Sequence, residues 1–98
     1  MSPRPASADL QRSVPIFAAL GDATRLQVIA RLSTDGPLSI SELTEGSEVT
    51  RQAVTKHLEV LATAGLVRDF RQGRERMFEL RTRQLEEALE RLRKMVEE

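Results

Sequence analysis

One segment, residues 39–65, constrains the fold more than any other part of the chain. It opens with a capping box, because the Ser39 hydroxyl can accept a hydrogen bond from the amide of Glu42 while the Glu42 carboxylate accepts one from the amide of Ser39. The helix that begins here is short, since Gly46 follows Leu43 within one turn.

The second helix of this segment is predicted over residues 51–64. Thr50 precedes it as an N-cap, and Gly65 follows it as a C-terminal stop. Its apolar residues lie on one face, so the opposite face is polar. The apolar face holds Val54, Leu58 and Leu61, and the polar face holds Arg51, Gln52, Thr55, Lys56 and Glu59. Two helices joined by a tight turn that contains glycine form a helix-turn-helix motif.

The N-terminal part is predicted to be a tail followed by a helix. Residues 1–8 contain two prolines and no apolar periodicity, so we expect a flexible tail, and residues 9–98 are expected to form a single domain. Apolar residues then recur at helical spacing as far as Gly21. Pro15 fits either the first turn of a helix capped by Ser13 or a kink.

The remaining segments complete the predicted fold. Asp22 is a good N-cap for a helix that the run Asp35-Gly36-Pro37 ends. Beyond the helix-turn-helix, Leu66–Phe70 and Arg76–Leu80 are predicted strands of a hairpin, and residues 83–97 are predicted to form a long amphipathic helix. This order, α-α-α-α-β-β-α, predicts a mostly α fold with a small β-hairpin, a winged helix-turn-helix.

The charges of the chain cancel overall but not locally. Fifteen Lys and Arg balance fifteen Asp and Glu. Residues 1–50 carry four cations and six anions, residues 51–83 carry eight and four, and residues 84–98 carry three and five. The net charges of −2, +4 and −2 place the basic block over the second helix of the motif and the hairpin. Such asymmetry indicates a polyanionic partner.

The composition excludes several functions. The chain has no Cys, so it has no disulfide, thiolate metal site or cysteine nucleophile. It has no Trp or Tyr and only three Phe, which leaves little to stack single-stranded bases. No apolar run is long enough for a membrane span, so we expect a cytoplasmic protein. Catalysis is not expected either, because the single histidine, His57, is predicted to be packed and hydrogen-bonded, and no nucleophile elbow or phosphate loop is present.

The basic block supplies side chains suited to DNA. Arg51 can bond guanine, Gln52 can pair with adenine, and Thr55 can contact a thymine methyl or a phosphate. The arginines of the hairpin, Arg74 above all, suit a narrow minor groove or its phosphates. The predicted DNA-binding residues are Thr50, Arg51, Gln52, Thr55, Lys56, Arg71, Arg74 and Arg76.

Two structural alternatives remain for these residues. The polar face of the helix could simply be solvated. In the hairpin, Arg68 and Arg76 could pair with Asp69 or Glu79 instead of binding DNA.

Several motifs resemble one known family. They are the runs FAALGDATRL (17–26), LSISEL (38–43), RQAVTKHL (51–58), LATAGLV (61–67) and GRERMFEL (73–80). In this order they resemble the ArsR-like (arsenical-resistance-repressor) winged-helix family. The resemblance covers roughly residues 10–97. It implies a bacterial, homodimeric transcriptional repressor that binds double-stranded DNA at an inverted-repeat operator.

The resemblance also implies that the first and last helices form the dimer interface. Both carry apolar residues that one small domain covers only in part. The predicted interface residues are Leu10, Val14, Phe17, Leu85, Leu89, Leu92 and Val96.

The sequence departs from the metal-sensing members of that family. Ser39 and Ser41 stand where those members carry Cys-x-Cys, and hydroxyls are poor ligands for soft metals. The last helix has no His. We therefore expect a metal-independent member with no cofactor, and the sequence names no inducer. The alternatives are a winged helix that binds a protein partner, and a DNA-binding sensor with a non-thiol metal or small-ligand site at the dimer interface.

Overall fold

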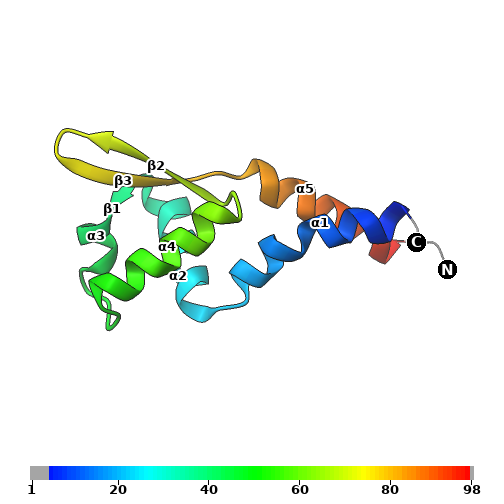
Figure 1. Cartoon of the computed structure of the whole chain (residues 1–98), viewed down its shortest axis with the longest axis horizontal. Helices are drawn as coiled ribbons and strands as arrows, with labels where there is room; N and C mark the ends of the chain where they lie inside the picture. The colour runs from blue at the N-terminus through cyan, green and yellow to red at the C-terminus, as the bar shows by residue number, and fades with distance from the viewer. Residues whose placement is uncertain (1–4, 98) are drawn as a thin grey trace.

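The computed structural model describes residues 5–97 and has five helices and three short strands there (Figure 1). The molecule is elongated, because the first and last helices lie side by side and project away from the other elements. The elements in chain order are α1 (Pro5–Leu20), α2 (Ala23–Asp35), β1 (Leu38–Ser39), α3 (Ile40–Thr44), α4 (Arg51–Thr63), β2 (Val67–Gln72), β3 (Glu75–Leu80) and α5 (Arg83–Glu97).

The apolar face of α4 lies at the centre of the core. Val54, Leu58 and Leu61 are each no more than 1% exposed. They recur every three or four residues, so they face the same side of the helix. This side packs into one apolar cluster with residues from every other element, such as Val28 of α2 and Phe78 of β3. The polar face of α4 is thereby turned outward.

Three predicted helix caps, at Asp22, Ser39 and Thr50, are confirmed. The Asp22 carboxylate accepts a hydrogen bond from the Arg25 amide at 3.0 Å, and the Thr50 hydroxyl accepts one from the amide of the third residue of α4 at 3.1 Å. The capping box at the start of α3 has both of its hydrogen bonds, at 3.1 and 3.0 Å between Ser39 and Glu42. Each such cap satisfies backbone amides that the first turn leaves free.

The sheet has one strand more than the sequence predicts. β1 pairs antiparallel with β3, with Leu38 opposite Phe78, and the strand order is β1-β3-β2. β1 is only two residues long, which is too short to show the alternation of apolar and polar residues that predicts a strand. It ties the start of α3 directly to the hairpin. The predicted mostly α winged helix-turn-helix fold is otherwise confirmed.

The hairpin turn is tighter than predicted. The strands extend to Gln72 and Glu75, which pair with each other, so Arg71 and Glu75 belong to strands rather than to a loop. The turn consists of Gly73 and Arg74 alone. Gly73 has a φ of 64°, while no described non-glycine residue has a positive φ. A glycine with positive φ at the first of two turn positions is typical of tight hairpins.

At the N-terminus the structure corrects the expected end of the tail and excludes one of the two alternatives for Pro15, the helix capped by Ser13. Residues 5–8 of the expected tail already belong to α1, while residues 1–4 lie outside the described part. Ser13 does not cap a helix but lies inside α1, fully buried, and accepts a hydrogen bond from Arg91 of α5 at 3.2 Å. Pro15 also lies within α1. Pro15 has no backbone N–H to donate within the helix, and packing against α5 supports α1 where that hydrogen bond is missing.

No helix among the described residues combines the length and apolar content that crossing a bilayer requires.

Leu61→Ala should test the central role of the α4 inner face. Leu61 is fully buried, so we expect the free energy of unfolding to fall by about 2–5 kcal/mol, the usual range for such a truncation. Urea denaturation followed by circular dichroism measures it. Val60→Ala is the matched control, because Val60 is 41% exposed. Equal losses for both variants would contradict the assigned core.

Candidate nucleic-acid interface

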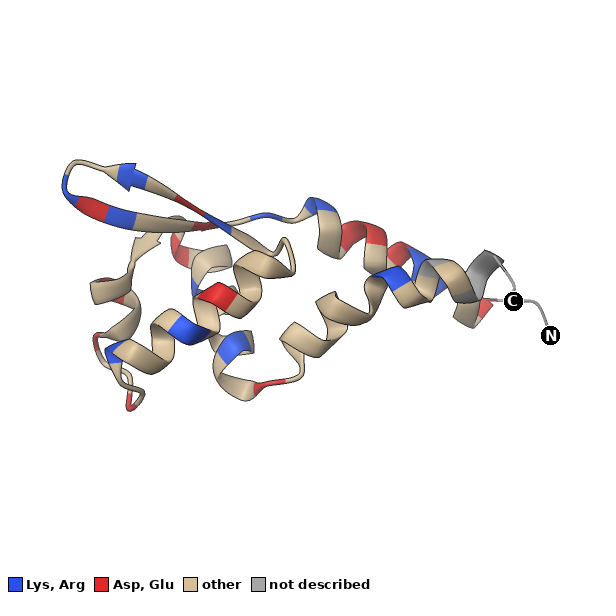
Figure 2. Ribbon diagram, viewed as in Figure 1, with Lys and Arg blue, Asp and Glu red and all other residues tan. Residues whose placement is uncertain are grey.

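The outer face of α4 is an open polar surface. The side chains of Arg51, Gln52 and Lys56 are exposed, and Thr55 is partly exposed. Figure 2 shows basic residues at the start and in the middle of this helix and along the neighbouring hairpin. The Thr55 hydroxyl donates to the Arg51 carbonyl at 3.0 Å, so its methyl group and oxygen lone pairs remain for a partner. Thr50 is exposed just before the helix.

The arginines of the hairpin divide into two groups. Arg76 pairs with Asp69 at 2.8 Å, and its guanidinium lies 5.0 Å from the centre of the Phe78 ring. Arg68 pairs with Glu79. These are the pairings that the sequence left open. Within residues 5–97, Arg71 and Arg74 form no ion pair with a carboxylate, and both are exposed.

One contact of Arg51 could not be predicted from local sequence. Its Nη1 atom donates a hydrogen bond to the Ser41 hydroxyl at 2.9 Å, which links the first residue of α4 to the second residue of α3. Sequence reasoning assigned Arg51 to a base edge and gave Ser41 no role in DNA binding. The two residues are ten positions apart and on either side of a turn, so no helical or strand spacing in the sequence indicates that they meet.

Comparisons with known proteins agree with this geometry. A family model described as a helix-turn-helix domain matches residues 20–69. YuzN, an uncharacterised HTH-type transcriptional regulator of Bacillus subtilis, is 44% identical over 63% of this chain and 74% of its own length. The solved structure of an ArsR-like transcriptional regulator from Rhodococcus sp. RHA1 has a TM-score of 0.77 at 33% identity, covering 90% of this chain and 79% of that one. This chain belongs to the ArsR-like transcriptional regulators.

A more distant structure supports the fold alone. It is a solution structure from Mycobacterium bovis, described as the homodimeric winged helix-turn-helix DNA-binding domain of a possible ArsR-family regulator. Its TM-score is 0.72 at 19% identity, and the match covers 98% of this chain and 88% of that fragment.

The single histidine of this ArsR-like chain fastens α4 to the junction of α1 and α2. His57 Nδ1 lies 3.3 Å from Nη1 of Arg25 and 4.0 Å from a carboxylate oxygen of Asp22. The Arg25 Nε donates to the Ala19 carbonyl at 2.6 Å. The Arg25 amide holds the pKa of Asp22 below its ordinary value. The expectation of a packed, hydrogen-bonded His57 is confirmed, and its contacts fix the position of α4.

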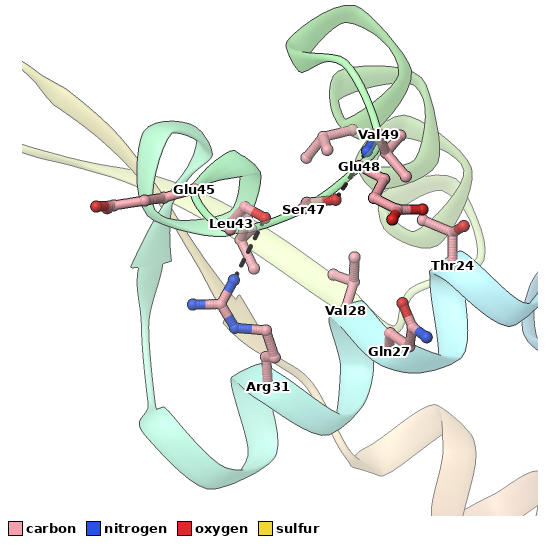
Figure 3. Close-up of a pocket in the computed structure, with 11 residues that line it drawn as sticks. Thr24, Gln27, Val28, Arg31, Leu43, Glu45, Ser47, Glu48 and Val49 are labelled. Carbon is pink, nitrogen blue, oxygen red and sulfur yellow. Dashed lines mark hydrogen bonds between the residues drawn. The ribbon is translucent and has the colours of Figure 1, made fainter.

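A second set of contacts holds the turn of the helix-turn-helix. Arg31 of α2 donates to the carbonyls of Glu42 and Leu43 at 3.0 and 3.3 Å. Figure 3 shows this guanidinium reaching across to α3 at one side of a pocket, whose other side is formed by the turn that carries Ser47 and Glu48. Among the described residues, no group of three or more His, Cys, Asp or Glu side chains could hold a metal ion.

The predicted dimer residues fall into two groups. Leu10, Phe17, Leu85 and Leu92 are half-buried. Val14, Leu89 and Val96 are 53%, 50% and 74% exposed, so large apolar side chains on α1 and α5 remain uncovered within one chain.

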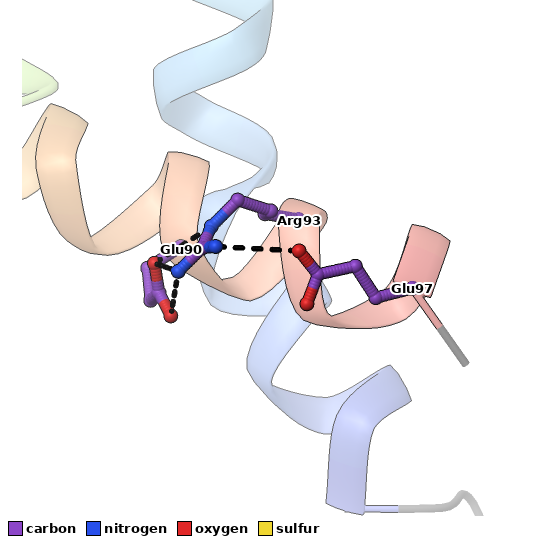
Figure 4. A network of polar contacts seen from close by, with 3 residues as sticks. All are labelled: Glu90, Arg93 and Glu97. Carbon is purple, nitrogen blue, oxygen red and sulfur yellow. Dashed lines mark hydrogen bonds and ion pairs between the residues drawn. The ribbon is translucent and has the colours of Figure 1, made fainter.

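The charges of α5 are neutralised within the helix itself. Figure 4 shows Arg93 between Glu90 and Glu97, with N–O distances of 2.6 and 3.2 Å. The Arg93 guanidinium lowers the pKa of Glu90 by hydrogen bonding to it. Glu87 pairs with Arg83 at 3.3 Å in the same way. These arginines therefore differ from Arg71 and Arg74, which have no such partners within the described residues.

Arg76→Gln should raise the pKa of Asp69. The hydrogen bond from Arg76 is the main reason that this pKa lies below its ordinary value. A lowered folded-state pKa stabilises the fold above the unfolded-state pKa, and that stabilisation is lost as the pH falls through the folded-state pKa. Carboxyl ¹³C chemical shifts followed through an acid titration measure the change. Arg68→Gln is the control and should leave the Asp69 titration in place. An unchanged titration in Arg76→Gln would rule out the ion pair in solution.

Proposed function

We propose that this chain is a homodimeric repressor, acting in the bacterial cytoplasm, that binds an inverted-repeat operator in double-stranded DNA. The observation that carries the proposal is the exposed outer face of α4, lying beside a hairpin tip whose Arg71 and Arg74 lack carboxylate partners among residues 5–97. Unpaired guanidinium groups are the natural partners of backbone phosphates.

In this proposal α4 enters the major groove. Gln52 and Thr55 face base edges near the start of the helix, where a recognition helix makes its contacts. Lys56 and the capped N-terminus at Thr50 contact phosphates. Arg71 and Arg74 reach the adjacent minor groove or its phosphates. Arg76 contributes by exchanging its ion pair with Asp69 for a phosphate.

Two copies are proposed to associate through α1 and α5. The support is the uncovered apolar surface of Val14, Leu89 and Val96 together with the homodimeric state of the M. bovis domain. The arginines on α5 are paired with glutamates of the same helix, so this surface has little excess charge to repel a second copy. A two-fold dimer matches two half-sites of an inverted repeat.

The inducing signal is proposed to be independent of a thiolate metal site. Ser39 and Ser41 supply hydroxyls, and the chain contains no Cys. The Ser39 hydroxyl is also occupied by the capping box.

DNA binding should be steeply salt-dependent. Because phosphate contacts release counterions, Arg74→Ala should weaken binding to every duplex and reduce the slope of log K against log[salt] by about 1. The measurement is fluorescence anisotropy on a duplex selected from a random library, and on a scrambled duplex, over a salt series. Lys94→Ala on α5 is the control of equal charge. The proposal would be contradicted if the chain bound a protein more tightly than DNA and that binding changed little with salt.

Leu89→Glu combined with Val96→Glu should give monomers that bind DNA weakly. Both side chains are at least half exposed, so the fold should survive while the apolar interface gains two carboxylates. Sedimentation equilibrium measures the association, and circular dichroism checks the fold. Leu26→Glu, at an equally exposed apolar position on α2, should remain dimeric. A double variant that stays dimeric would remove α5 from the interface.

A further inference from the structure

We infer that a cleft between the start of α3, the start of α4 and the hairpin tip is an oxyanion site that holds one backbone phosphate of DNA. Ser41 is the positioning residue of this site, because it directs Arg51 to the phosphate instead of to a base edge. This inference rests on the proposed DNA-binding function and assigns a specific role within it.

The first argument is the direction of the Arg51 side chain. Its hydrogen bond to Ser41 draws the guanidinium from α4 towards α3. A guanidinium has five N–H donors, so one bond to a hydroxyl leaves the others free for two oxygens of a phosphate. The Ser41 hydroxyl accepts from Arg51, so its part is to hold the guanidinium beside the anion. An arginine held in this way does not extend freely along the axis of α4 towards base edges.

The second argument is the charge around the cleft. Its walls include Arg51, Arg71, Arg74 and Arg76, against a single carboxylate, that of Glu75. Arg76 is neutralised by Asp69. Within the described residues the other three arginines form no ion pair with a carboxylate, so the cleft carries excess positive charge.

The third argument is a like-charge pair in the hairpin. Arg71 and Arg76 lie directly opposite each other in the register of β2 and β3. Like charges in that arrangement destabilise a sheet. Asp69 forms an ion pair with Arg76, whereas Arg71 acts on Asp69 only through its charge and forms no ion pair with a carboxylate in the described part of the chain. An anion bound in the cleft would relieve this repulsion, so the two facing arginines are consistent with an anion-binding role.

The fold holds the walls of the cleft together. β1 ends at Ser39, which pairs with Met77 of β3, and α3 begins at the next residue. The capping box then fixes the first turn of α3, where Ser41 lies. The hairpin and the two helices of the motif are thus linked beside the cleft, and the site needs little rearrangement to accept a phosphate.

The test compares Arg51→Ala, Ser41→Ala and Ser41→Thr in the full chain. Binding constants are measured over a salt series on the selected duplex and on its single base-pair variants. Arg51→Ala should weaken binding to all duplexes by one common factor and reduce the salt slope by about 0.9. Ser41→Ala should produce part of the same loss, and Ser41→Thr, which keeps the hydroxyl, should restore binding. Arg81→Ala, at an exposed position outside the cleft, is the matched control and should keep the salt slope.

A double variant separates positioning from a direct or purely structural effect. Ser41→Ala should add nothing to Arg51→Ala if Ser41 acts through Arg51. Additive losses, or wild-type binding by Ser41→Ala, would overturn the positioning role. If Arg51→Ala relaxes the preference at one base pair and leaves the salt slope unchanged, Arg51 reads a base and the phosphate assignment is wrong.

A second arm titrates inorganic phosphate into the DNA-free protein and follows the arginine side-chain Nε–H signals by NMR. The signals of Arg51, Arg71 and Arg74 should shift together, and Arg51→Ala should abolish the shifts. If inorganic phosphate binds in the cleft but Arg51→Ala has the same salt slope of DNA binding as the wild type, the site binds a free oxyanion and its role on DNA is overturned. Absence of any salt-dependent DNA binding by the wild type would refute the proposed function. In that case the phosphate titration alone would decide whether the cleft binds an oxyanion. Shifts in these signals support an oxyanion site, and their absence overturns it.

Discussion

The structure depends on the burial of one face of α4. Val54, Leu58 and Leu61 are almost completely removed from water, and truncating any of them would leave a cavity that a small core cannot easily close. Once this face is buried, the helical period determines that Arg51, Gln52, Lys56 and Glu59 point outward. The hydrophobic core thus sets the orientation of the polar surface, and the contacts of His57 and Arg31 hold α4 and its turn in that orientation.

The chain has no net charge overall, but its charges are arranged differently on α5 and at the hairpin tip. On α5, arginines pair with glutamates of the same helix, which removes charge from the surface that we propose to bind a second copy. At the hairpin tip and the start of α4, arginines lack carboxylate partners among residues 5–97. In Figure 1 these two regions lie at opposite ends of an elongated molecule. Association and DNA binding can therefore occupy separate surfaces.

Features with local signals could be predicted from the sequence, and features that depend on distant partners could not. Caps at Asp22, Ser39 and Thr50 involve residues three apart, and the structure has all three. β1 depends on pairing with β3, far along the chain, and the buried Ser13 accepts a hydrogen bond from an arginine 78 residues away. The bond between Arg51 and Ser41 likewise forms only when the turn brings two helices together. Side-chain chemistry thus indicated which residues could face DNA, but only tertiary contacts show how Arg51 is held.

The central claim is that the start of α4 and the hairpin tip face DNA while α5 does not. An NMR titration of the full chain with a selected duplex, followed by backbone amide shifts, tests it most directly. We predict shifts concentrated in residues 50–56 and 71–76, with the amides of α5 unaffected. Shifts concentrated in α5, with α4 and the hairpin unchanged, would contradict the account.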